Sequence, residues 1–154
     1  MRLIQNMAQT KAEVSKVAQS ATAAKNPVLS HGVGRRKKSV ARAWLRRGKG
    51  TIIVNGMEME KYFDTEFMRL AVNMPFVACP VAKNYDIKIN VLGGGKVGQA
   101  DATKLAISRA LIENDDTLRA DLKKYKLLTV DSRVKERKKY GQKAARAKFQ
   151  FVKR

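Results

Sequence analysis

The sequence predicts an α+β fold, in which one small domain of strands and helices is followed by an extended basic tail. Two segments alternate apolar and polar residues with a period of two, which is typical of strands with one buried face. Two others repeat apolar residues at three-to-four spacing, which is typical of helices that cover a sheet. The last 22 residues carry ten Lys or Arg and one Glu, so self-repulsion opposes their folding into a core.

The net charge indicates the kind of partner. The 154 residues contain 33 Lys and Arg against 13 Asp and Glu, which gives a formal net charge of +20. Such a surface attracts polyanions, and nucleic acid is the polyanion that we expect. An anionic membrane is the alternative. The chain has no apolar run of about 20 residues to span a bilayer, so we expect no membrane partner.

Little in the composition points to catalysis or to a metal site. Cys79 lies in an apolar stretch with no Cys or His nearby to complete a zinc site, and we expect it to be a small core residue. His31 is the only histidine in the chain. We therefore expect neither a His-based triad nor a metal or cofactor, and the chain is predicted not to be an enzyme.

Residues 1–31 are predicted to be a disordered N-terminal extension. They are rich in Ala, Ser, Thr, Gln and Lys and contain no Phe, Trp or Tyr, so they offer little to bury. An organelle transit peptide is the alternative, although Arg2 is the only arginine in this segment. Met7 is an alternative start of the chain.

Two β-rich runs separated by glycines predict a hairpin. Residues 39–46 alternate apolar and polar side chains, and residues 51–55 form a second run of β-formers. Two glycines in residues 47–50 indicate a turn between them. We expect a β-hairpin with a basic edge.

A helical or partly helical segment is predicted over residues 57–72, where apolar side chains recur at three-to-four spacing. We expect Pro75 and Pro80 to end this pattern. The helix would cover the sheet with one apolar side, formed by Met59, Tyr62, Phe63, Phe67, Leu70 and Ala71.

The clearest strand and the strongest helix follow each other in the second half. Residues 85–92 alternate strictly, residues 93–99 are a glycine-rich turn, and residues 100–113 are rich in Ala, Leu and Ile. Residues 117–124 predict a short second helix, and residues 127–130 could complete the sheet.

The glycine turn matches two nucleotide-binding patterns only in part. Gly93, Gly95 and Gly98 fit G-x-G-x-x-G, but the acidic residues that follow lie at a helix end and not after a second strand, as a dinucleotide fold requires. A P-loop needs Lys and Ser or Thr where this chain has Gln99 and Ala100. Neither enzyme class is therefore favoured.

Two interpretations of the turn stay open. Backbone N–H groups at the start of the helix, beside Lys96, could form a small anion site for one phosphate. Alternatively, the glycines serve only a tight turn that needs positive φ angles.

Two basic segments are predicted to contact RNA. Eight cations lie between Arg35 and Lys49 with no acid among them, although a solvated edge that prevents sheet aggregation is the alternative. In the tail, Tyr140, Phe149 and Phe151 lie among cations and could stack on bases, although a solubilising or localisation-signal-like appendage is the alternative. The residues predicted to contact RNA are Arg35, Arg36, Lys37, Lys38, Arg42, Arg46, Arg47, Lys49, Lys96, Arg133, Lys135, Arg137, Lys138, Lys139, Lys143, Arg146 and Lys148.

Several motifs resemble one known family. They are residues 32–42 (GVGRRKKSVAR), 93–102 (GGGKVGQADA), 107–111 (ISRAL), 131–139 (DSRVKERKK) and the terminal FVKR. In this order they resemble the bacterial-type small-subunit ribosomal protein nine family, and the resemblance covers residues 32–154.

The resemblance implies a fold, a function and domain boundaries. The fold would be a two-layer α/β domain with a mixed sheet and helices on one face, as in the second domain of ribosomal protein five. The protein would be a structural constituent of the small ribosomal subunit that binds 16S-type rRNA in the head, beside neighbouring head proteins. Residues 1–31 would be the extension, residues 32–131 the folded domain and residues 132–154 the tail. We expect the ribosome of the cytoplasm as destination, with an organellar ribosome as the alternative.

The resemblance also implies a role for the end of the tail. Lys153 and Arg154 would approach the tRNA bound at the peptidyl site. The chain departs from the family pattern at Val152, where Ser is common, and at Tyr140 and Phe149, where Pro is common. Loss of proline would make the tail less stiff.

Two other classes of function are weighed against this one. A free-standing nucleic-acid chaperone or DNA-binding protein would satisfy the charge, but it would protect no defined rRNA region in footprinting. A nucleotide-binding enzyme using Gly93 to Gly98 would bind ATP tightly with magnesium.

Overall fold

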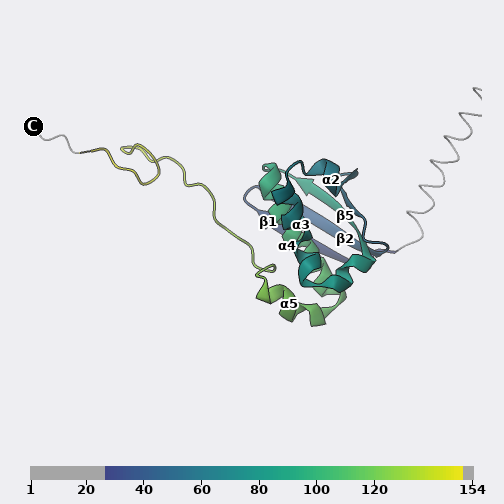
Figure 1. Cartoon of the computed structure of the whole chain (residues 1–154). Coiled ribbons are helices and arrows are strands. Elements are labelled where there is room, and N and C mark those ends of the chain that lie inside the picture. Colours follow the sequence, from purple (N-terminus) through teal and green to yellow (C-terminus); the bar gives the residue numbers. More distant parts are fainter. Residues whose placement is uncertain (1–26, 151–154) are drawn as a thin grey trace, which may run out of the picture.

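The computed structural model describes residues 27–150, which form a sheet with helices on one face and a tail that leaves the domain (Figure 1). The strands are β1 (Ser30–Arg36), β2 (Ser39–Arg47), β3 (Ile52–Val54), β4 (Met57–Glu58) and β5 (Tyr85–Leu92). The helices are α2 (Met59–Tyr62), α3 (Glu66–Ala78), α4 (Lys96–Asn114) and α5 (Arg119–Lys124), with 3-10 helices at Pro80–Asn84 and Asp116–Leu118.

The sheet is mixed and has the strand order β1-β2-β5-β3-β4. Strand β3 pairs with β5 in parallel, whereas the other neighbouring strands are antiparallel. The helices α3 and α4 cover one face, and no helix of the described residues covers the other (Figure 1). This two-layer arrangement is that of the second domain of ribosomal protein five, and it confirms the predicted fold class.

Alternating burial explains why β2 and β5 are strands. Ala41, Ala43 and Leu45 of β2 and Ile87 and Ile89 of β5 are buried against the helices, whereas the residues that alternate with them are less buried or exposed. Both strands therefore confirm the period-two prediction. Cys79 is buried in the same core, and this burial raises the pKa of its thiol, so the sulfur stays protonated at neutral pH.

Strand β1 was not predicted as a strand, because its two glycines interrupt the apolar alternation. The glycines allow α4 to pack unusually close to the sheet. A Cβ atom on Gly32 would lie 2.1 Å from the Ala106 carbonyl oxygen, and one on Gly34 would lie 1.9 Å from the Ala102 carbonyl oxygen. Both glycines are thus required by packing. The strand begins at Ser30, two residues before the expected start of the domain.

The predicted hairpin between residues 39–46 and 51–55 is wrong, because β5 lies between β2 and β3. The glycine-rich segment between them is a loop that crosses the start of β5. Asp86 of β5 holds this loop, because its Oδ1 atom accepts hydrogen bonds from the backbone N–H groups of Lys49, Gly50 and Thr51. The local sequence pattern therefore predicted β2 and β3 as strands, but it did not predict which strands pair with each other.

Residues 57–72, predicted to be helical or partly helical, are partly helical. The segment divides into β4, α2 and α3, and α3 continues through Pro75 to Ala78. Pro75 removes one backbone donor, but the helix resumes after it, since the Cys79 N–H donates to the Pro75 carbonyl at 2.9 Å. Phe67 and Leu70 were expected to face the sheet, yet they are 68% and 58% exposed.

Residues 127–130 do not complete the sheet. They contain no strand, because Leu127 is buried beneath the end of α5 and its N–H donates to the Leu122 carbonyl at 3.1 Å. The chain beyond, residues 132–150, contains no helix or strand and runs away from the domain (Figure 1). The predictions made for residues 1–26 and 151–154 lie outside the described residues.

Candidate nucleic-acid interface

The open face of the sheet presents cations beside an aromatic pair. Along β2, the residues between the buried ones point to this face, among them Arg42 and Trp44, with Arg46 half-buried. His31 of β1 and Lys88 of β5 lie directly opposite Trp44 on either side. The rings of His31 and Trp44 are 5.9 Å apart at an angle of 42°. Arg42 and Lys88 are both exposed.

Lys88 and Trp44 were missed as site residues by sequence reasoning. The alternation in residues 85–92 had already placed Lys88 on the polar face of its strand. Only the strand order, with β5 beside β2, brings Lys88 next to Trp44. Cross-strand neighbours of this kind lie within about 5.5 Å at Cβ, so both can touch one ligand.

The loop after β2 presents further cations. Arg47, the last residue of β2, and Lys49 are both exposed. The Asp86 carboxylate, which binds three successive backbone N–H groups of the loop, keeps the backbone at Lys49 in one position. The lysine therefore projects from a fixed loop.

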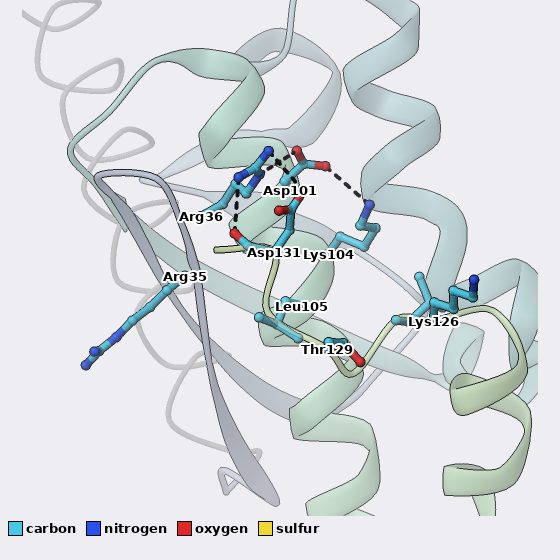
Figure 2. Close-up of a pocket in the computed structure, with 9 residues that line it drawn as sticks. Arg35, Arg36, Asp101, Lys104, Leu105, Lys126, Thr129 and Asp131 are labelled. Atoms are coloured by element: carbon cyan, nitrogen blue, oxygen red, sulfur yellow. Dashed lines mark hydrogen bonds and ion pairs between the residues drawn. The ribbon is translucent and has the colours of Figure 1, made fainter. Parts of the chain in front are cut away.

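The hairpin between β1 and β2 presents two more cations at its tip. Lys37 and Lys38 are exposed in a two-residue turn, and Lys37 has a φ angle of 52°. A positive φ costs a non-glycine residue about 1 kcal/mol or more. Arg35, the next exposed cation, points away from the cluster of charges on the other side of β1, as Figure 2 shows.

Arg36 belongs to that other side and is bound within the protein. Its Nη1 atom donates to the carbonyl oxygens of Asp131 at 3.1 Å and of Arg133 at 2.6 Å. Its Nη2 lies 3.0 Å from the Asp131 carboxylate, and its Nε lies 3.7 Å from the Asp101 carboxylate (Figure 2). The predicted ridge of residues 35–49 is thus divided between two faces of the domain.

Lys96 is also bound within the protein. Its Nζ atom donates to the Tyr62 carbonyl at 2.7 Å and lies 4.0 Å from the centroid of the Tyr62 ring. The turn before it needs glycine, since Gly93 and Gly94 have φ angles of 72° and 64°. A Cβ atom on Gly94 would lie 2.1 Å from the Ser39 hydroxyl oxygen. A tight turn therefore accounts for these glycines, and a phosphate site there stays a prediction.

The tail presents most of its cations to solvent. Arg133 pairs with Asp131 and Arg146 pairs with Glu136. Tyr140 is 97% exposed, and Phe149 is exposed as well. The remaining predicted cations are exposed, namely Lys135, Arg137, Lys138, Lys139, Lys143 and Lys148. Phe151, Lys153 and Arg154 lie outside the described residues.

The chemistry available on this surface is binding. Within residues 27–150, no three His, Cys, Asp or Glu side chains are grouped as a metal site would require. In the same residues no helix is long and apolar enough to cross a membrane. Guanidinium and ammonium groups can bind phosphates, and exposed rings can stack on bases.

Comparison with known proteins decides the family. A model of the family described as ribosomal protein S9/S16 matches residues 34–154, which include the end of β1, the other strands, the helices and the tail. The chain belongs to this ribosomal protein family. Ribosomal protein S9 is structural and not enzymatic. The family therefore agrees with the prediction that the chain is not an enzyme.

Named S9 relatives match over nearly their whole length. Each is named small ribosomal subunit protein uS9. The protein of Chlorobium chlorochromatii is 55% identical over 122 residues, 79% of this chain and 95% of the relative. The protein of Pelodictyon phaeoclathratiforme is 56% identical over the same shares. The protein of Cytophaga hutchinsonii is 48% identical over 124 residues, 80% of this chain and 97% of the relative.

Proposed function

We propose that the protein binds 16S-type rRNA in the head of the small ribosomal subunit through the open face of its sheet. Its role in the small subunit is structural, as the names of its S9 relatives indicate. The observation that carries the proposal is the cluster of Arg42 and Lys88 around the paired rings of Trp44 and His31. We expect the exposed cations of the hairpin tip and of the Lys49 loop to add further phosphate contacts.

The two kinds of side chain have different tasks on this face. Arg42 and Lys88 neutralise phosphates, which contributes affinity and orientation but no sequence readout. Trp44 is half-buried in the sheet, so its ring is held in place and offers one face for stacking on an unpaired base or a ribose. A rigid sheet places these groups at fixed spacings, which suits a folded RNA of defined shape.

The tail supplies a second contact in the same proposal. It leaves the domain as an extended basic segment with an exposed ring at Tyr140 (Figure 1). We expect it to enter RNA-rich space and to bring Lys153 and Arg154 to peptidyl-site tRNA. Neighbouring head proteins are the other expected partners. The bacterial origin of the relatives favours the ribosome of the cytoplasm.

Sedimentation in a sucrose gradient at moderate and high salt tests the proposed assembly, with the protein followed by blot. We expect co-migration with the small subunit that persists at high salt. Footprinting on the same subunits would then show one protected rRNA region. Release into the top fractions, with no reproducible protection, would instead support a free-standing nucleic-acid chaperone.

A further inference from the structure

The base of the tail is held to the folded domain by one side chain. Arg36 is the last residue of β1, and its side chain is 14% exposed. Its guanidinium binds two backbone carbonyls of the tail base, at Asp131 and Arg133, as well as the Asp131 carboxylate. Bonds to carbonyls fix the direction of the chain, whatever side chains the chain carries.

The group of charges around Arg36 is complete without an external anion. Asp101 of α4 lies 3.7 Å from Arg36 and also pairs with Lys104 at 3.2 Å. Asp131 pairs with Arg36 at 3.0 Å and with Arg133 at 2.8 Å. Two carboxylates therefore lie among three cations, and Figure 2 shows Arg36 directed toward both carboxylates. A phosphate entering here would meet two negative groups.

These bonds are the last that attach the described tail to the domain. Beyond Arg133, the ion pairs of residues 134–150 join side chains within the tail, as between Arg146 and Glu136. Leu127 is buried six residues earlier than Arg133, and the residues from 132 onward are mostly exposed. Arg36 thus binds the chain just after its last buried apolar residues, where apolar packing no longer attaches it to the domain.

We propose that Arg36 is a positioning residue that fixes where and in which direction the tail leaves the domain, and that it is not itself an RNA contact. The proposal deepens the proposed function, because a fixed exit matters only if the tail has a target. A flexible tail of 23 residues would spread over roughly 25 Å. Fixing its first residues raises the effective concentration of its end at one place.

The substitution Arg36→Lys separates positioning from phosphate binding. It keeps the positive charge but loses the planar fork that binds two carbonyls and a carboxylate at once. Arg35→Lys is the matched control, because Arg35 is the neighbouring residue and its side chain points away from the tail base (Figure 2). Both variants are made in the full chain.

Backbone order parameters of residues 132–134, measured by NMR on the free protein, are the first readout. We expect values near 0.85 in the unmodified protein and in Arg35→Lys, and below 0.6 in Arg36→Lys. Unchanged order in Arg36→Lys would overturn the proposal. If that variant does not fold, Asp131→Asn tests the same anchor from the tail side, with a fall in order expected.

A salt titration of rRNA binding is the second readout. We expect Arg36→Ala to leave the slope of log K against log salt unchanged. A slope reduced by about 0.7 to 0.9, and restored by Arg36→Lys, would show a direct phosphate contact and refute the assignment. In assembled subunits, Arg36→Lys is expected to weaken peptidyl-site tRNA retention roughly tenfold.

Failure of the anchor and failure of the proposed function give different results. The order parameters are measured without RNA, so they report on Arg36 even if the tail has no tRNA target. If removal of the tail end leaves tRNA retention unchanged, the tail's proposed role fails while the anchor stands. If order persists in Arg36→Lys while removal of the tail end weakens retention, only the anchor fails.

Discussion

Gly34 of β1 lies against the backbone of Ala102 in α4 so closely that a Cβ atom on the glycine would be 1.9 Å from the alanine carbonyl oxygen. The obstacle is backbone, which cannot move aside as a side chain can. We expect Gly34→Ala to destabilise the domain by about 3 kcal/mol, as overpacking of a rigid core does. Urea unfolding measures the change. Gly95→Ala is the control, because nothing lies within 4 Å of its Cβ position and its φ is ordinary.

Asp86 is expected to be needed for the loop that carries Lys49. Its carboxylate accepts three backbone N–H groups, and Asp86→Ala would leave them without this partner. Hydrogen bonds to a charged group contribute about 1.5 to 3 kcal/mol, so we expect a loss of about 2 kcal/mol in the free energy of unfolding. Asp64→Ala, at an exposed position, is the control. Equal stability of the two variants would contradict this role.

The Asp131 carboxyl is expected to stay ionised in acid. Hydrogen bonds from Arg133 hold its pKa well below the usual range, and the charge of Arg36 adds to this effect. Because folding lowers this pKa, the stabilisation is complete above the ordinary value of about 3.9 and is lost only as pH falls through the lower folded value. NMR titration of the side-chain carboxyl should show no midpoint above about pH 3. In Arg133→Gln the pKa should rise.

Charge on the open face is expected to set the salt dependence of rRNA binding. Arg42→Ala and Lys88→Ala should each reduce the slope of log K against log salt by about 0.7 to 0.9. Lys123→Ala removes the same charge from α5 and should leave the slope unchanged. Equal effects of all three substitutions would indicate that only net charge matters, and the sheet face would lose its assignment.

The end of the tail is expected to act on tRNA and not on assembly. Deleting Lys153 and Arg154 removes two cations that lie far along the chain from the sheet. Sedimentation should show normal incorporation into small subunits, while peptidyl-site tRNA dissociates more readily at each salt concentration. Filter binding of tRNA measures the loss. Unchanged tRNA affinity would contradict the contact, and failed incorporation would point to a role in rRNA docking.

Local pattern predicted the strands at β2 and β5 because burial alternates along each of them. It could not predict which strands are neighbours, since that depends on β5 entering between β2 and β3. It missed β1 because glycine there serves a helix that is distant in sequence. The cations were all visible in the sequence, but the partners of Arg36 were not, because Asp101 and Asp131 approach it only in the folded chain.

The central position of β5 has a consequence for how the protein is made. Strands β1 and β2 leave the ribosome exit early, but the strand that joins them to β3 and β4 comes some forty residues after β2 ends. Two separate strand pairs are marginal in water. The sheet is therefore stable only after β5 has been synthesised and has paired with β2 and β3, and after α4 has covered β1. Folding should occur as one late and cooperative event, with no stable N-terminal half, and chains that stop before residue 92 should be degraded or aggregate.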